Sequence, residues 1–290
     1  MKRLKTLVPS VAFLASVAMA AGVANAAPIV EWGFSLTNQW DQASTTWSPG
    51  GVVPAAPFGS GNVLPDGNDP AGSYTYIQWG SPAVPGGSKS FLAADSPVVR
   101  SGLFTNDSAG VSGSYYYHGN YIQYSPSNTR ESWMSSTKLT TEITLQSLDP
   151  AGQNIEITRS YSISFQETLN EVPLEQCPGY PWPPMGPAPG MPTCPDQLTI
   201  DISDLTFSTG VIDGYIYDFT VVFDPTSFEN IAGVTQNPDG TVTLWTNEEV
   251  LSRLGTRIYV TARVPEPAPL ALLGAGLLFG GLAMRRRKVA

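Results

Sequence analysis

Hydrophobic and polar side chains alternate along several segments of this chain, most regularly between Lys138 and Leu148. The alternation places one set of side chains on a common face: Leu139, Thr141, Ile143, Leu145 and Ser147. Successive side chains of a strand point to opposite faces, so this period of two predicts a half-buried β-strand. The residues from Asp149 to Gln153 are typical of a turn. The pattern of the residues that follow predicts that the chain returns as a second strand over 154–168.

The apolar face of the returning strand contains one charged residue, Arg159. Arg159 is separated from Ile157 and from Tyr161 by two positions, so it lies on the same face of the strand as these two residues. Because a shift of one residue would move every side chain to the other face, we expect Arg159 to face inward unless a bulge or a partner carboxylate accommodates it.

Further short segments alternate or are rich in β-branched and aromatic residues, and each is bounded by Gly, Pro, Asn or Asp. Asn237 to Gly240 is one such turn signal. Around Gly119-Asn120 the pattern fits either a tight hairpin or one bent strand. The predicted strands are 73–79, 88–92, 112–118, 121–124, 197–207, 215–223, 241–246 and 256–262.

Roughly eight to eleven short strands at this spacing predict an all-β fold, a single two-sheet β-sandwich of jelly-roll-like topology over residues 27–263. The alternative is two small β domains divided near the Pro-rich loop 170–196.

The N-terminal residues have a different pattern. Lys2, Arg3 and Lys5 precede an apolar run from Leu7 to Val23, and Ala24-Asn25-Ala26 is a small-x-small cleavage site. Residues 1–26 are therefore predicted to be a secretory signal peptide recognised by the Sec translocon.

The C-terminal residues 264–290 combine three units. Val264-Pro265-Glu266-Pro267 is extended, because each proline disfavours the helical region for the residue before it. The uncharged run 268–284 spans ~25 Å as a helix, the short limit for crossing a membrane. Arg285-Arg286-Arg287-Lys288 then fixes its end on the cytoplasmic side.

These three units, in this order, resemble the C-terminal sorting signal of the PEP-CTERM proteins of Gram-negative bacteria. The resemblance implies transient insertion of a transmembrane helix, processing by an exosortase-type membrane protease, and export to the cell envelope, outer surface or extracellular matrix. An ordinary C-terminal membrane anchor is the alternative.

The charge distribution narrows the class of partner. Three of the 15 Lys and Arg residues lie in the first five residues and four lie at 285–288, so 8 remain between them against 24 Asp and Glu, a net charge of −16. Nucleic acids and anionic lipids require clustered cations, so this acidic body argues against both. It suits a soluble surface protein or a matrix cross-linked by divalent cations.

The two cysteines, Cys177 and Cys194, bracket a Pro-rich loop in a chain predicted to reach an oxidising compartment. We predict a disulfide that contributes ~3 kcal/mol. A redox or zinc site is less well supported, because no CxxC is present.

The only histidine, His118, lies two residues before Asn120. This pair resembles the signature of a Thr-His-x-Asn subgroup of PEP-CTERM proteins, together with Trp79-Gly80 upstream, Phe165 to Asn170, and Cys194-Pro195-Asp196. Tyr117 stands where the subgroup has Thr. The resemblance implies an identity and no activity. Physically, His118 and Asn120 share a strand face and suit either a ligand contact or the orientation of a turn.

No pattern in the sequence assembles a catalytic set, so we predict a non-enzymatic protein without a cofactor. Glu167 and Asp196 are the carboxylates with the most context for a secreted hydrolase, whereas Glu248-Glu249 looks like a turn. Asp66 to Asp69 and Asp239-Gly240 offer oxygens for Ca²⁺ but lack the full 12-residue EF-hand pattern.

The remaining feature is a Tyr-rich segment near His118, with Tyr115, Tyr116, Tyr117, Tyr121 and Tyr124. Aromatic side chains on a sheet fill a core or stack on sugars. The sequence therefore predicts an exported envelope or matrix protein associated with exopolysaccharide or biofilm, and the alternative is a carbohydrate-binding module that uses this Tyr-rich face.

Overall fold

The computed structural model describes residues 27–48, 53–68, 72–80, 88–121, 132–168, 174–177 and 194–265. Within these ranges the chain forms strands and two short 3-10 helices, at Leu174–Gln176 and Ser203–Leu205, and no α-helix. Residues 29–210 and 217–263 group into one compact unit. In the other unit, the described turn 211–216 is closed by hydrogen bonds between Ile212 and Tyr215.

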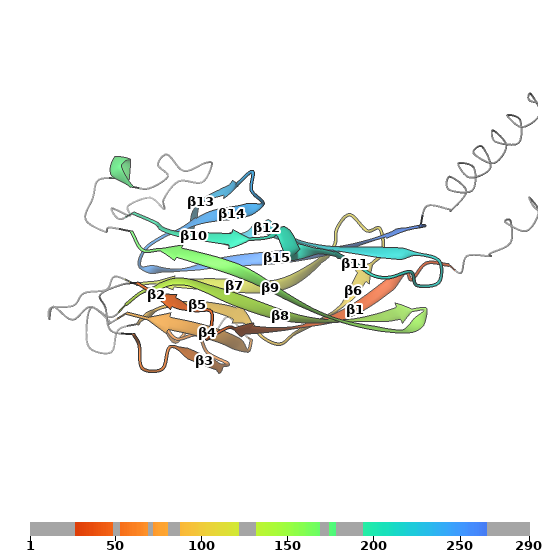
Figure 1. Cartoon of the computed structure of the whole chain (residues 1–290), viewed down its shortest axis with the longest axis horizontal. Coiled ribbons are helices and arrows are strands. Elements are labelled where there is room, and N and C mark those ends of the chain that lie inside the picture. The colour runs from red at the N-terminus through yellow and green to blue at the C-terminus, as the bar shows by residue number, and fades with distance from the viewer. Residues whose placement is uncertain are drawn as a thin grey trace, which may run out of the picture. The chain divides into compact units, whose positions relative to one another are not determined.

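One antiparallel sheet has eight strands (Figure 1). Seven of them lie in the order β13 (Ile231–Gln236), β14 (Thr241–Thr246), β10 (Asp196–Asp201), β9 (Ala151–Gln166), β8 (Met134–Asp149), β1 (Glu31–Trp40) and β6 (Val98–Phe104), and β2 (Thr46–Trp47) pairs with β8.

The second sheet has seven strands. Their order is β11 (Thr206–Ser208), β12 (Ile216–Glu229), β15 (Val250–Arg263), β7 (Val111–Asn120), β5 (Ser90–Asp95), β4 (Tyr74–Trp79) and β3 (Phe58–Gly61). The predicted all-β, two-sheet class is confirmed. The jelly-roll topology stays a prediction.

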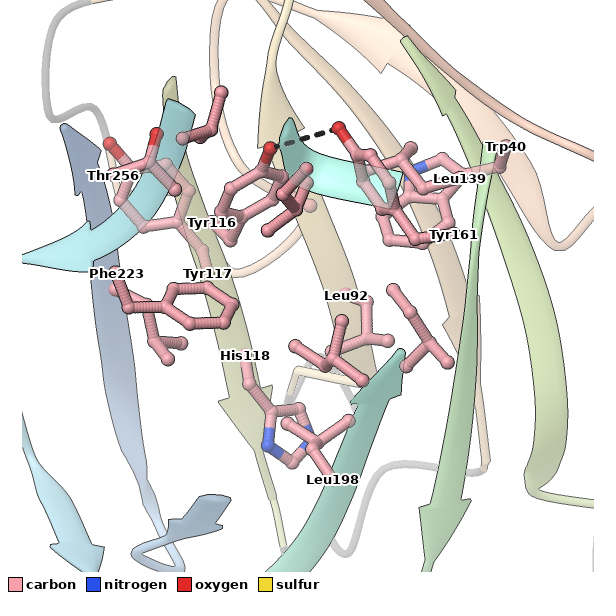
Figure 2. A pocket seen from close by; sticks show the side chains of 16 residues that line it. Trp40, Leu92, Tyr116, Tyr117, His118, Leu139, Tyr161, Leu198, Phe223 and Thr256 are labelled. Atoms are coloured by element: carbon pink, nitrogen blue, oxygen red, sulfur yellow. Dashed lines mark hydrogen bonds between the residues drawn. The ribbon is translucent and has the colours of Figure 1, made fainter. Parts of the chain in front are cut away.

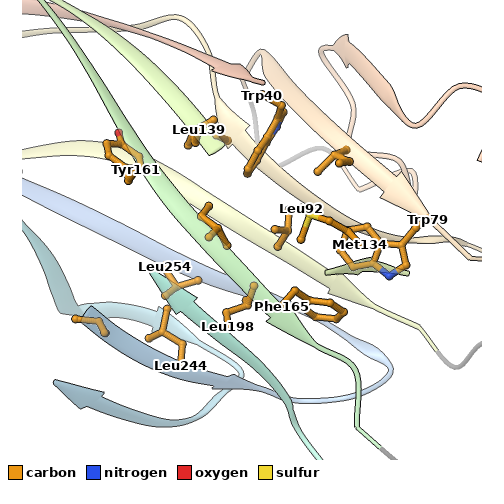
Figure 3. Close-up of a cluster of buried hydrophobic side chains, with 14 of the residues drawn as sticks. Trp40, Trp79, Leu92, Met134, Leu139, Tyr161, Phe165, Leu198, Leu244 and Leu254 are labelled. Atoms are coloured by element: carbon orange, nitrogen blue, oxygen red, sulfur yellow. The ribbon is translucent and has the colours of Figure 1, made fainter. Parts of the chain in front are cut away.

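The core lies between the two sheets (Figure 3). Trp40, Leu139, Phe165 and Leu198 come from the eight-stranded sheet, and strands of the seven-stranded sheet supply others, such as Leu92. Each sheet has one apolar face, and packing the two sheets face to face removes these two apolar faces from water.

The predicted hairpin of β8 and β9 is confirmed. The five residues predicted to share a face of β8 are all buried: Leu139, Thr141, Ile143, Leu145 and Ser147. Arg159 keeps the predicted parity without a bulge, since it pairs with Thr141 in an unbroken register. Its guanidinium lies over the ring of Phe207, 5.3 Å from the centroid, so an aromatic face accommodates the charge.

The structure decides against a hairpin turn at Gly119-Asn120. Strand β7 runs through both residues, which pair with Leu251 and Val250 of β15. Five strands were absent from the sequence prediction, namely β1, β2, β3, β6 and β13, where short length or aromatic, Gly or Asn residues obscure the period. The predicted turn at Asn237 to Gly240 is confirmed between β13 and β14.

The predicted signal peptide and C-terminal helix lie outside the described residues. Within the part of the chain that is described, no helix has the length and apolar character needed to cross a membrane.

Candidate functional site

Segments far apart in the sequence meet at one end of the sandwich, on the left in Figure 1. Trp79 ends β4, His118 lies near the end of β7, and Phe165 lies near the end of β9. The ring of His118 stacks on Trp79 with centroids 6.0 Å apart and meets Phe165 edge-on at 5.4 Å. Three of the segments singled out in the sequence therefore form one aromatic cluster.

His118 is completely buried, at one end of an apolar cavity of about 40 Å³ (Figure 2). Its Nδ1 lies 2.7 Å from Oγ1 of Thr246, and that hydroxyl is 3.4 Å from the carbonyl oxygen of Asp196. If Thr246 donates to this carbonyl, Nδ1 carries the imidazole proton. Burial lowers the pKa of His118 to about 3, so the ring is neutral.

Three carboxyl groups gather beside this cluster. Glu167 directly follows β9, Asp196 is the first residue of β10, and Glu248 lies in the connection between β14 and β15. That connection crosses from the eight-stranded to the seven-stranded sheet, which carries Glu248 into the end of the sandwich. One oxygen of each carboxyl group lies within 4.8 Å of the others.

Burial dominates the electrostatics of these acids. It raises the pKa of Glu167 to about 7 and the pKa of Glu248 to about 8. The pKa of Asp196 is raised well above its ordinary value by burial, and then by the neighbouring charges of Glu167 and Glu248. Three buried carboxylates cannot all stay ionised without a compensating charge, so the cluster must hold protons or a cation.

Most carboxyl oxygens of the cluster have no hydrogen-bond donor. Asp196 Oδ1 accepts from the backbone N–H of Thr168 at 2.9 Å. By contrast, Asp196 Oδ2, both carboxyl oxygens of Glu248 and Oε2 of Glu167 are buried, and no donor among the described residues bonds to them. The indole of Trp79 lies near Glu167 and acts to lower the pKa of that carboxyl, against the effect of burial, without the geometry of a hydrogen bond.

Asn120 is the second polar residue singled out with His118, and it faces this cluster. It is completely buried as the last residue of β7. Its side chain is close enough to Glu248 to lower the pKa of that carboxyl, yet neither Oδ1 nor Nδ2 has a hydrogen-bond partner among the described residues. The preceding Gly119 lets the ring of Phe91 lie against the strand, because a Cβ there would be 2.1 Å from it.

The predicted disulfide between Cys177 and Cys194 is confirmed, with a Cα–Cα distance of 5.3 Å. Both cysteines are buried against Ala232 and Trp245. The carbonyl of Cys194 accepts a hydrogen bond from Oγ1 of Thr168 at 2.8 Å. The bridge therefore fixes the chain two residues before Asp196.

The Tyr-rich segment divides between two faces of β7. Tyr117 is buried in an outer cluster with Tyr74, Phe91 and Leu64, whereas Tyr116 points inward with His118 and lies 3.4 Å from the hydroxyl of Tyr161 (Figure 2). Tyr124 lies outside the described residues. Sugar binding by this face, and a direct ligand contact of His118, stay predictions.

The two loops that the sequence offered for Ca²⁺ use their carboxylates in local turns. Asp66 accepts from the backbone and side-chain nitrogens of Asn68 and from the hydroxyl of Tyr121. Asp239 accepts from the backbone and the hydroxyl of Thr241. The carboxylates without a donor among the described residues instead include Glu248, which the sequence analysis interpreted as part of a turn. The connection between the two sheets buries it, and no local sequence signal indicates that this connection changes sheet.

Of the predicted sorting residues, Val264 and Pro265 directly follow β15, and the structure describes neither Glu266-Pro267 nor the basic residues 285–288. No curated protein and no solved structure matches the chain. Residues 263–288 match the model of the PEP-CTERM protein-sorting motif, which implies export and membrane-associated processing by an exosortase-type partner.

Proposed function

We propose that this is a non-enzymatic protein of the cell envelope or extracellular matrix, exported through the Sec translocon, held transiently by its C-terminal helix and then released by an exosortase-type protease. The observation that carries the proposal is the position of the sorting motif. It begins at Arg263, the residue at which the last strand of the sandwich ends.

This position separates the signal from the fold. Arg263 is the last residue of β15, and its Nε donates to Oδ2 of Asp218 at 2.7 Å, which fixes the end of the strand on β12. Every strand and every core residue of the sandwich among the described residues precedes this point. The folded unit is therefore suited to survive release from its helix.

Two further observations support a non-enzymatic role at the surface. Asp196 and Glu248 are 0 % and 1 % exposed, so a polysaccharide chain cannot flank them as glycoside hydrolysis requires. The acidic body suits a hydrated matrix containing divalent cations. The assignment to the Thr-His-x-Asn subgroup stays a proposal: its segments meet in the folded chain, and Tyr117 departs from the signature.

The test is the C-terminus of the settled protein. Mass spectrometry of the wild-type chain should find no peptide beyond the Pro-Glu-Pro motif, and replacing Pro265 and Pro267 by Ala should leave the helix attached and the protein in the membrane fraction. Pro238→Ala, in the turn between β13 and β14, is the matched control and should be processed normally. Wild-type protein that keeps its C-terminal helix or stays in the cytosol would contradict the proposal.

Association with exopolysaccharide is tested separately. The released protein should co-fractionate with the matrix polysaccharide of its producing strain and should elute when that polysaccharide is digested. Binding of an isolated oligosaccharide on a glycan array, lost on replacement of Tyr115 by Ala, would favour the carbohydrate-binding alternative instead.

A further inference from the structure

We propose that Glu167, Asp196, Glu248 and Asn120 bind a divalent cation, that Ca²⁺ is the ion they suit best, and that this ion ties the two sheets of the sandwich together. The proposal stands independently of how the protein is sorted, because it concerns the folded unit alone.

The spacing of the carboxyl oxygens fits one shared ion. One oxygen from each of Glu167, Asp196 and Glu248 lies within 4.8 Å of the others. Two oxygens that each lie about 2.3–2.6 Å from the same Ca²⁺ are at most about 5 Å apart. Three oxygens at the full 4.8 Å from one another would each lie ~2.8 Å from a central ion, so at most a small shift lets a single ion contact all three.

Asn120 provides an observation independent of the acids. Its amide is completely buried against Glu248, and both Oδ1 and Nδ2 lack a hydrogen-bond partner among the described residues. Buried polar groups in native proteins are almost always satisfied, so an amide left without a partner beside three carboxyl groups points to a missing ligand. Oδ1 is a neutral oxygen of the kind that completes calcium sites.

The chemistry of the donors selects the ion. The cluster contains three carboxyl groups and an amide, all oxygen donors, and its formal charge of −3 exceeds what one divalent ion neutralises. Zinc and copper prefer imidazole and thiolate ligands, whereas both cysteines are used in the disulfide. Magnesium loses its water shell reluctantly, which a buried site penalises.

The position of the ligands gives the ion a structural consequence. Asp196 belongs to the eight-stranded sheet, Glu167 directly follows β9 of the same sheet, and Asn120 belongs to the seven-stranded sheet. Glu248 lies in the connection that crosses between them. An ion bound by all four would join the sheets at the end where the disulfide fixes the start of β10.

The experiment is a calcium titration of the exported protein purified from its producing cells and stripped with EDTA. Calorimetry should detect one Ca²⁺ per chain, and saturating Ca²⁺ should raise the melting temperature by about 5–10 °C relative to EDTA. Glu248→Gln should weaken binding at least about tenfold, because it removes a charged ligand.

Glu249→Gln is the matched control, since it removes the same charge from the adjacent exposed residue of the same connection. It should leave the calcium affinity within about threefold of wild type. If Glu248→Gln does not fold, Glu167→Gln takes its place, because Glu167 is only partly buried. Asp66→Asn, in a surface turn, should leave the titration unchanged.

Several results would overturn the proposal. Wild-type protein that shows neither binding heat nor a change in melting temperature at 10 mM Ca²⁺ (about tenfold above the weakest extracellular calcium sites) would do so, as would equal losses in Glu248→Gln and Glu249→Gln. A response to Zn²⁺ or Mg²⁺ without one to Ca²⁺ would refute the assigned ion. Stabilisation by acid alone, with no response to calcium, would assign the cluster to shared protons.

Discussion

Two asparagines are buried in the same sandwich, and the protein treats them differently. Asn38 on β1 is 3 % exposed and every polar atom of its side chain is satisfied. Its Nδ2 donates to the carbonyl of Asp95 at 2.6 Å and to Oγ of Ser114 at 3.0 Å, while Oδ1 accepts from Oγ1 of Thr141 at 2.5 Å. The hydroxyl of Ser96 bonds to its backbone.

Asn120 on β7 is at least as deeply buried, yet no described residue bonds to its amide, and carboxyl groups stand beside it. The Asn38 network shows that this fold can complete a buried polar cluster from its own hydroxyls and carbonyls. The difference indicates that the unsatisfied polar groups around Asn120 are not a general feature of this core. The Asn120 end is built from the groups that an ion requires.

The largest expected loss of stability comes from breaking the hydrogen-bond network around Asn38. Asn38→Ala removes one hydrogen bond each from the carbonyl of Asp95 and the hydroxyls of Ser114 and Thr141, which should cost roughly 3–4 kcal/mol of unfolding free energy. The loss should be the same in EDTA and in Ca²⁺, as measured by urea unfolding.

Asn120→Ala is the counterpart. It removes an amide that has no hydrogen-bond partner among the described residues, so in EDTA it should cost less than Asn38→Ala, and its main effect should be a smaller stabilisation by Ca²⁺. Equal losses for the two variants, both insensitive to calcium, would remove the distinction between the two asparagines.

The disulfide has the next largest effect. Replacing Cys177 and Cys194 by Ala should cost about 3 kcal/mol, because the bridge restricts the unfolded loop between them. It should also weaken calcium binding, since Thr168 connects Cys194 to Asp196. Denaturant unfolding of this variant measures the loss of stability, and calorimetry measures its calcium affinity. An unchanged calcium affinity would show that the disulfide does not influence the ion site.

The third prediction concerns pH in EDTA. The pKa values of Glu167 (about 7) and Glu248 (about 8) lie above their ordinary value of 4.5, the pKa of Asp196 is raised as well, and the nearby charge of Glu249 contributes to raising that of Glu248. A raised folded-state pKa stabilises below the unfolded pKa, and this contribution disappears as pH rises through the folded pKa. Unfolding free energy should therefore fall between about pH 5 and pH 8.

Calcium should reduce that fall, because the ion replaces the protons as the compensating charge. The Asn38 network should contribute nothing to it, since its amide and hydroxyls do not titrate in this range. Chemical unfolding at several pH values, with EDTA and with Ca²⁺, checks both statements. A stability that rises from pH 5 to pH 8 in EDTA would contradict the buried-acid interpretation.

The smallest effect is expected at Asp224, a carboxylate that is already paired with an arginine. Asp224 accepts hydrogen bonds from Thr226 and pairs with Arg257 at 2.7 Å, and these contacts lower its pKa. A lowered pKa stabilises above the unfolded value and is lost as pH falls, the opposite sign to the buried acids. Asp224→Asn should cost less than about 1 kcal/mol at pH 7, and the cost should shrink as the pH falls below about 4, measured by chemical unfolding.

Local patterns predicted a large part of this fold. The alternation from Leu139 to Ser147 marked the buried face of β8 because a strand with one wet face must alternate. Strand β1 escaped prediction, since Trp32, Gly33 and Phe34 are all buried in sequence, and continuous burial has no period of two. Its place between β8 and β6 depends on distant pairing.

The candidate site was only partly predictable. Glu167, Asp196, His118 and Asn120 were singled out by a resemblance, and the structure brings their segments together. Glu248 was not, because adjacent glutamates usually mark an exposed turn and only the connection between the sheets buries one of them. Burial of a single loop residue is a property of tertiary topology, which no local period records.

The most direct measurement is a crystal structure of the protein grown in Ca²⁺, with anomalous diffraction to locate the ion. The account predicts one anomalous peak about 2.3–2.6 Å from oxygens of Glu167, Asp196 and Glu248, with Oδ1 of Asn120 in its coordination shell. Carboxyl groups hydrogen-bonded directly to one another and to Asn120, with no peak between them at saturating calcium, would contradict it.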